Sequence, residues 1–505
     1  MKNKRSVYLK RNTVMSLTFE ALTIICGFIL PRFILRAFGS ETNGLVSSIT
    51  HFLGFISLCE LGMGAVVPAS LYRPLAEKNM DRVSAVVASA QKFYRVIAAI
   101  LLGYIMVLVG VYPLAVKDSF DFIFSASLIL IISISTFAQY YFGITYTLLL
   151  KSDQKQYISF IINSVTLVLN TVISIILIKC GFSIHIVKLA SSIIFIARPL
   201  CLNLYVKKHY KLNLKVKYGG EPIKQKWNGI AQHFAATIQE KADTVILTLL
   251  SSLTSVSVYG VYFMVVNGIK GLIYSLTAGV SAMLGNMLAK EETEQLNKTF
   301  AKFEWLMHTL STYLFTVTGI LAVPFVKVYT LGLKDANEYI VPAFSAVLCM
   351  ALAARCLQMP YNTMVHVAGH FKQTQKSAMI EPILNIIVSV ALVYKFGLIG
   401  VAVGTLVSMG YRVIYLSVYL MKNILFTKPF VFIKQICVDA LSVLVMVAAV
   451  CWLKLSSLSF AGWILLALPV AFICLAVCLL INLIFYKEQL LSNIKPILNR
   501  LRRKK

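Results

Sequence analysis

Charged residues are scarce in this chain. Asp, Glu, Lys and Arg make up 13% of its 505 residues, whereas hydrophobic residues make up 58%. Soluble domains carry nearer a quarter of charged residues. Long apolar runs lie at 96–116, 122–137, 158–178, 438–452 and 463–485. About 20 apolar residues cross a bilayer, and the backbone there must form its hydrogen bonds internally. The composition therefore predicts an all-α, polytopic membrane protein.

Sequence motifs of soluble catalysis are also lacking. There is no Gly-Lys dipeptide, hence no G-x-x-x-x-G-K-[ST] phosphate loop, and no H-E-x-x-H, D-x-D or G-x-S-x-G motif. The ten cysteines form no C-x-x-C pair, and most of them lie inside apolar runs. No predicted loop much exceeds about twenty residues. We expect no enzyme, no metal site and no cofactor, and a process that takes place within the membrane.

Lys and Arg gather at particular ends of the apolar runs. They follow the second, fourth and sixth predicted spans and occupy both chain termini, while the loops on the other side hold few. By the positive-inside rule this predicts an even number of spans with both termini in the cytoplasm. The net charge of +28 then reflects topology and anionic lipid, not nucleic acid. The fourteen predicted spans are roughly 13–37, 43–69, 93–115, 121–149, 157–178, 183–206, 228–251, 257–289, 304–331, 340–366, 377–395, 398–421, 431–453 and 462–486.

The chain repeats itself at an offset of about 215 residues. The segment L-N-T-V-I-S at 169–174 matches L-N-I-I-V-S at 384–389, and weaker matches keep nearly the same offset. Because each copy has an even number of spans, the copies are predicted to be parallel. We predict an N-terminal six-helix lobe (1–215), a C-terminal six-helix lobe (216–429), and two further helices with a basic cytoplasmic tail (430–505). A Lys-rich linker (207–227) joins the lobes.

Polar side chains inside spans are costly and mark candidate functional positions. One face of the seventh span and one face of the eighth are polar. These stripes predict either a wet cavity between the lobes or hydrogen-bonded seams between helices. The cavity-lining candidates are Gln232, Gln239, Asn267 and Tyr274.

Several charged residues also lie within or near spans. Deep cations favour an anionic substrate such as a phosphate group, although ion pairing or an interfacial position explains each of them as well. The acids at membrane depth can pair with these cations or bind a coupling proton or sodium ion; they are Glu20, Glu60, Glu240, Asp243, Glu381 and Asp439. The substrate-binding candidates are Arg32, Arg198, Lys270, Arg355 and Arg412, and the ion-coupling candidates are Glu20, Glu60, Glu240 and Asp243.

Three segments carry a resemblance to a known family. They are L-P-R-F-I-L-R-A-F-G-S-E-T-N-G-L-V at 30–46, E-L-G-M-G at 60–64 and L-Y-R-P-L-A at 71–76. With the six-plus-six-plus-two layout, they resemble Wzx-type polysaccharide repeat-unit flippases of the multidrug/oligosaccharidyl-lipid/polysaccharide exporter superfamily. The resemblance implies two alternating lobes, a cationic central cavity that includes Arg32 and Lys270, and an undecaprenyl-diphosphate-linked oligosaccharide as substrate.

The resemblance also implies a place and partners. We expect the bacterial cytoplasmic membrane, surrounding lipids, and association with a polysaccharide polymerase and glycosyltransferases for capsule or O-antigen assembly. The driving force is expected to be H⁺, Na⁺ or the membrane potential. The alternatives are a drug or small-molecule exporter of the same fold, a membrane-embedded polymerase or ligase, and a non-transporting scaffold.

Overall fold

The computed structural model describes residues 2–214, 230–276, 280–427 and 430–491. Within these ranges every regular element is a helix. Twelve helical stretches there are long and apolar enough to cross a membrane. This confirms the prediction of an all-α, polytopic chain. Most of the Lys-rich linker and the whole basic tail lie outside the described residues.

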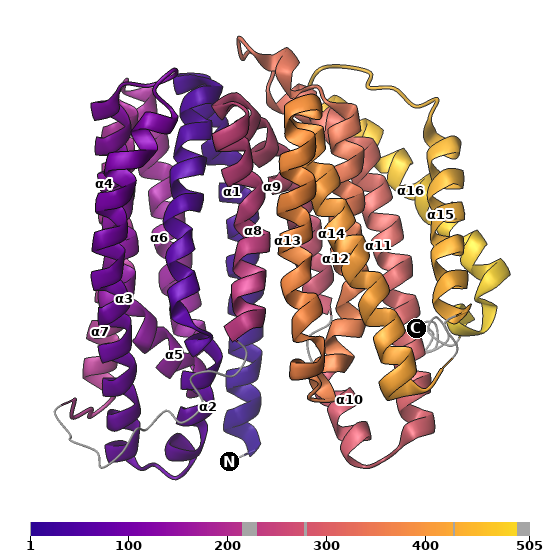
Figure 1. Ribbon diagram of the computed structural model, residues 1–505, viewed down its shortest axis with the longest axis horizontal. Coiled ribbons are helices and arrows are strands. Elements are labelled where there is room, and N and C mark those ends of the chain that lie inside the picture. The colour runs from indigo at the N-terminus through magenta and orange to yellow at the C-terminus, as the bar shows by residue number, and fades with distance from the viewer. Residues whose placement is uncertain (1, 215–229, 277–279, 428–429, 492–505) are drawn as a thin grey trace, which may run out of the picture. The chain divides into compact units, whose positions relative to one another are not determined.

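The first compact unit comprises residues 1–257. In Figure 1 it runs from indigo to magenta. Its helices are α1 (Lys2–Gly54), η1 (Phe55–Glu60), α2 (Met63–Ala76), α3 (Met80–Ala115), α4 (Phe122–Ala138), η2 (Gln139–Gly143), α5 (Ile144–Ser152), α6 (Gln156–Lys179), α7 (Ile184–His209) and α8 (Ile230–Leu250).

The second compact unit comprises residues 258–505. Its helices are α9 (Leu253–Leu276, which begins in the first unit), α10 (Val280–Ala289), α11 (Thr293–Tyr329), η3 (Ala336–Tyr339), α12 (Pro342–Val367), α13 (Phe371–Phe396), α14 (Leu398–Leu420), η4 (Met421–Leu425), α15 (Phe430–Val450) and α16 (Phe460–Phe485). The structure divides into these two compact units. The division into three domains, 1–215, 216–429 and 430–505, remains a prediction.

Within the described ranges, the residues of the fourteen predicted spans lie largely in helices, and twelve stretches there satisfy a length-and-hydropathy criterion. Helix α1 carries the first predicted span and the beginning of the second, which continues through η1 into α2. The helix breaks at Gly39, where φ is +81°. A side chain would strain the backbone at such an angle, and glycine removes that strain. Helix α8 carries the seventh predicted span, but Glu240, Lys241 and Asp243 lower its hydropathy. The predicted number of membrane-spanning helices is therefore roughly consistent with the structure.

Small residues let α13 and α14 approach closely (Figure 1). A Cβ atom built on Gly404 would lie 2.0 Å from Oγ and 2.8 Å from the backbone nitrogen of Ser389. A Cβ atom on Gly400 would lie 2.6 Å from the carbonyl of Leu392. Glycines spaced by four residues favour such contact between membrane helices. The face of α14 that carries Gly400 and Gly404 is therefore fixed against α13.

The repeated Asn-x-x-x-Ser motif lies at a helix contact in each unit. Ser389 of α13 donates to Asn385, at 2.9 Å, and contacts the backbone carbonyl of Val401 on α14, at 3.3 Å. In the first unit, Ser174 of α6 lies 3.5 Å from Asn170 and 3.4 Å from Ser191 of α7. Both copies of the motif thus join a helix to the helix that follows it.

We predict that Gly404→Ala destabilises the protein, because its methyl group has no space beside Ser389. Overpacking of this kind costs about 1–3 kcal/mol. The melting temperature in detergent, followed by fluorescence-detected size exclusion, should fall by several degrees. The control is Gly410→Ala on the same helix, where nothing lies within 4 Å of the added carbon. Equal melting temperatures for the two variants would contradict the prediction.

Candidate functional site

A buried carboxylate in the second unit binds two guanidinium groups. Glu381 of α13 lies 3.1 Å from Nη1 of Arg355 on α12, and 3.6 Å from Nε of Arg412 on α14. Arg412 also donates to the hydroxyl of Ser377 and, at 3.3 Å, to the carbonyl of Thr374. A charge in this setting requires a partner because removal from water is costly. The three charged side chains hold α12, α13 and α14 together.

Two other predicted residues gather beside this ion cluster. Lys270 and Tyr274 lie one turn apart on α9, with the ammonium 6.0 Å from the ring centroid. Tyr274 also lies within side-chain hydrogen-bond reach of Arg355. We call Lys270, Tyr274, Arg355, Glu381 and Arg412 the cationic cluster. It holds three cations and one carboxylate, so it retains net positive charge when all are ionised.

The remaining second-unit candidate, Asn267, lies one turn before Lys270 on α9. Its side-chain oxygen is buried and has no hydrogen-bond partner among the described residues. The structure thus places Lys270, Tyr274, Arg355 and Arg412 in one cluster; their role in binding a substrate stays a prediction. The partner Glu381 was recognised as a deep acid but not assigned to the site, because its pairing depends on how three helices pack.

The predicted cations of the first unit lie on separate helices. Arg198 on α7 donates to the hydroxyl of Thr166 on α6, at 2.7 Å, and its guanidinium lies 4.1 Å from the ring centroid of Phe195. This contact joins α6 and α7. Arg32 lies partly buried in α1, within the first segment that carries the family resemblance.

The polar stripe of α8 is partly buried within the first unit. Gln239 and Asp243 are buried, Gln232 is intermediate and Glu240 is exposed. The helix packs on α1 and η1 through polar contacts: Ser48 with Thr248, at 2.8 Å, and His233 with the carbonyl of Ser57, also at 2.8 Å. These hydrogen bonds fit the alternative in which polar residues of α8 form a seam between helices and do not line a cavity.

The other acidic candidates differ in environment. Glu20 is exposed on α1. Glu60, at the end of η1, accepts a hydrogen bond from the hydroxyl of Tyr140, at 2.6 Å. Tyr140 belongs to η2, a π-helical turn between α4 and α5. Helical turns of this type occur frequently at functional sites. In the part of the chain that is described, no group of three or more His, Cys, Asp or Glu could hold a metal ion.

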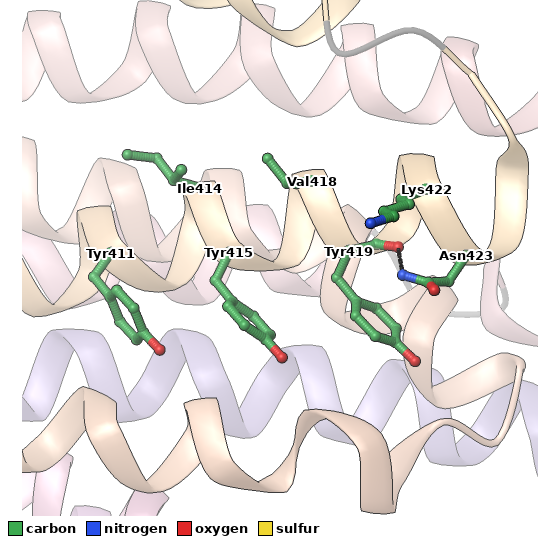
Figure 2. Close-up of a pocket in the computed structure, with 7 residues that line it drawn as sticks. All are labelled: Tyr411, Ile414, Tyr415, Val418, Tyr419, Lys422 and Asn423. Carbon is green, nitrogen blue, oxygen red and sulfur yellow. Dashed lines mark hydrogen bonds between the residues drawn. The ribbon is translucent and has the colours of Figure 1, made fainter.

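A groove along α14 was not predicted from the sequence. It has a volume of about 520 Å³ and is lined by Tyr411, Ile414, Tyr415, Val418, Tyr419, Lys422 and Asn423. Figure 2 shows the three tyrosines projecting in one direction from the helix. Successive ring centroids lie 6.1 and 6.2 Å apart. The spacing of four residues within an apolar span was the available signal.

A second polar cluster was also missed. Glu304, His308, Tyr361 and Asp439 form a continuous hydrogen-bonded chain through α11, α12 and α15. Only Asp439 was recognised as a deep acid. The signal on α11 was the spacing of four between Glu304 and His308, which places both side chains on one helix face.

Comparison with known proteins gives the fold. No family model matches the chain, and no curated protein matches its sequence. The lipid II flippase MurJ in an inward closed conformation aligns with 94% of this chain and 99% of its own, with a TM-score of 0.71 and 16% identity. An inward-facing multidrug resistance MATE family transporter of the MOP superfamily aligns with 82% of this chain and 99% of its own (TM-score 0.63, 13% identity).

The chain has a MurJ/MATE-like fold and is a multi-pass membrane protein. A third structure agrees: the MATE multidrug transporter DinF-BH aligns with 83% of this chain and 97% of its own (TM-score 0.61, 16% identity). At these identities the similarity establishes the fold. It does not establish the substrate.

We predict that Glu381→Gln destabilises the second unit. The change leaves two guanidiniums without their shared carboxylate, and breaking a buried ion pair costs about 3–5 kcal/mol. The melting temperature should fall, and adding Arg412→Met should recover part of the loss. Glu77→Gln serves as the control, because Glu77 pairs with Arg73 on an exposed helix face. No rescue in the double variant would contradict the pairing.

Proposed function

We propose that this protein is a flippase for undecaprenyl-diphosphate-linked oligosaccharide repeat units. It moves them from the inner to the outer leaflet of the bacterial cytoplasmic membrane, by alternating access along a path lined by the predicted cations. The product serves the assembly of a polysaccharide of capsule or O-antigen type. Both chain termini face the cytoplasm, and the protein itself performs no enzymatic step.

The observation that carries this proposal is the extent of the structural similarity. The lipid II flippase aligns with 94% of the 505 residues, against 82% for the multidrug transporter. The difference of 12% corresponds to about 60 residues, which is the length of the segment that contains α15 and α16. A lipid flippase therefore accounts for more of this chain than a drug transporter does.

The cationic cluster supports an anionic substrate. Lys270 and Arg355 are each only partly buried, so an anion can reach them. A guanidinium offers a planar pair of donors to phosphate oxygens, and an ammonium offers a point charge. Sugar hydroxyls and a diphosphate cannot enter hydrocarbon unaided, since each unpaired polar group costs several kcal/mol. Cations along a hydrated path lower that barrier.

The tyrosine groove of α14 supports a carbohydrate. Aromatic rings pack against the C–H faces of sugars, and phenolic hydroxyls bond to sugar hydroxyls. The rings at 411, 415 and 419 repeat at about 6 Å, which is four residues of helix rise. Partner proteins would be the polymerase and glycosyltransferases that use and supply the same lipid-linked sugar.

The alternative is an exporter of drugs or small molecules with the same fold. Three transporters of that kind or its superfamily share the architecture at 11–16% identity. A cationic drug would require an acidic binding surface, whereas the cationic cluster of the second unit holds three cations and one carboxylate. A membrane polymerase or ligase has less support, because the helices are joined by short connections in the described ranges.

The test is a flipping assay in proteoliposomes with a labelled prenyl-diphosphate oligosaccharide, read by access of a membrane-impermeant sugar oxidant. The wild-type protein should expose the substrate on the opposite leaflet. Lys270→Ala and Arg32→Ala should each slow this by about tenfold or more, equivalent to about 1.4 kcal/mol. Lys298→Ala, an exposed lysine paired with Glu294, is the control.

Two results would contradict the proposal. One is a wild-type protein that does not flip the prenyl-diphosphate sugar but transports a cationic dye under the same conditions. The other is equal flipping by wild type, Lys270→Ala and Arg32→Ala, which would refute the role of the predicted cations.

A further inference from the structure

A chain of four ionisable side chains runs through the second unit. The hydroxyl of Tyr361 on α12 lies 2.7 Å from Oε1 of Glu304 on α11. It also lies 3.1 Å from Nε2 of His308, one turn further along α11. The other ring nitrogen of His308, Nδ1, lies 2.5 Å from Oδ2 of Asp439 on α15. The hydrogen-bonded order is therefore Glu304, Tyr361, His308, Asp439.

The chain is enclosed except at one end. The side chain of His308 is fully buried, Glu304 and Tyr361 are buried, and the side chain of Asp439 is 15% exposed. The ring of Tyr361 packs against Phe300 and Phe432. Asp439 is thus the end from which a proton can enter or leave.

The surroundings of these two acids in the described part of the chain hold few other titratable groups. Within the described ranges, neither Glu304 nor Asp439 forms an ion pair with a lysine or arginine; Asp439 instead contacts Nδ1 of His308. The other titratable groups near the two acids are Cys478 of α16 and Tyr486 just beyond it, and the Lys434 ammonium lies over the Tyr486 ring, 4.9 Å from its centroid.

The polar groups of α16 that face α11 are satisfied without the chain. The side-chain oxygen of Asn482 accepts from Nε1 of Trp305, at 2.7 Å, and from the hydroxyl of Thr309, at 3.1 Å. These bonds do not involve Glu304, His308 or Asp439. These contacts between α11 and α16 are therefore separate from the four-residue chain.

Counting protons gives the chain two arrangements. A phenolic hydroxyl has one proton, and neutral imidazole has one N–H. In the first arrangement Glu304 holds a proton and donates to Tyr361, Tyr361 donates to Nε2 of His308, and Nδ1–H donates to ionised Asp439. In the second, Asp439 holds the proton and donates to Nδ1, Nε2–H donates to Tyr361, and Tyr361 donates to ionised Glu304.

A concerted shift converts one arrangement into the other. The O–H bond of Glu304 breaks as a proton passes to Tyr361, the Tyr361 proton passes to Nε2, and the Nδ1 proton passes to Asp439. Net, one proton moves from Glu304 to Asp439, and Tyr361 and His308 end with the number of protons they began with. With the same number of protons, the shared proton can instead lie on His308, which gives an imidazolium between Asp439 and Tyr361 with both acids ionised.

We propose that this chain binds and relays the coupling proton of the transporter, with Asp439 and His308 as the entry pair and Tyr361 as the relay to Glu304. Histidine suits this task because it exchanges protons near physiological pH. Ionisable groups inside membrane helices commonly form proton paths. The proposal rests on the proposed transport function and names its driving ion.

The decisive variant is Tyr361→Phe, which removes the relay hydroxyl and keeps the ring between Phe300 and Phe432. In proteoliposomes, a pH gradient of one unit supplies a factor of about ten per coupled proton. With the wild-type protein, the ratio of substrate between the two leaflets should change by about tenfold when this gradient is applied. With Tyr361→Phe the ratio should not respond to the gradient. Tyr262→Phe is the matched control, because Tyr262 is equally buried in this unit and its hydroxyl donates to the carbonyl of Tyr339, at 2.8 Å.

A second measurement does not depend on transport. Infrared difference spectra of the detergent-solubilised protein between two pH values should show a protonated-carboxyl band. Asp439→Asn or Glu304→Gln should remove it, His308→Gln should shift it, and Tyr262→Phe should leave it intact.

The two measurements separate the two proposals. A carboxyl band with the expected variant effects, without flipping of any lipid-linked sugar, supports the proton site and refutes the flippase function. Flipping that ignores the pH gradient in wild type, or follows a sodium gradient instead, overturns the proton site while the flippase function stands. An unchanged response in Tyr361→Phe also overturns it.

Discussion

The arrangement of the second unit depends on the cost of placing a charge away from water. Glu381 binds Arg355 and Arg412, and the three side chains come from three consecutive helices. Removing Glu381 leaves the buried guanidinium of Arg412 without its acidic partner. The close approach of α13 and α14 makes the pairing geometrically possible. Gly400, Gly404 and Arg412 are separated by multiples of four residues on one buried face of α14, so the glycines bring the backbone near enough for Arg412 to reach Glu381.

The membrane architecture could be predicted because hydrocarbon restricts the backbone so strongly. Apolar runs of about twenty residues can only be helices there, and the placement of Lys and Arg indicated an even count. Within the described ranges the predicted spans lie largely in helices, including α8, whose charges lower its hydropathy. The break at Gly39 had a weaker signal: a glycine between two apolar runs is compatible with a continuous helix, and only the backbone angle distinguishes the two.

The pairing of the polar residues could not be predicted in the same way. Lys270, Arg355 and Arg412 were recognised from their depth. The pairing of Glu381 with Arg355 and Arg412, however, depends on the rotation of three helices about their axes. The hydrogen bonds of His308 could not be predicted for the same reason, because its partners on α12 and α15 lie 53 and 131 residues away in the chain. Periodicity identifies which residues of one helix share a face. It carries no information about which face of another helix lies opposite.

The two guanidiniums that share Glu381 differ in what can reach them. The side chain of Arg355 is 27% exposed, whereas that of Arg412 is 4% exposed. Arg412 also donates to two oxygens of α13, so its donors are directed into the protein. Arg355 instead lies beside Lys270 and Tyr274. A phosphate that approaches this cluster therefore competes with Glu381 for Arg355, while Arg412 keeps the carboxylate charge balanced. Within one cluster, one arginine stabilises the fold and the other is accessible to an anion.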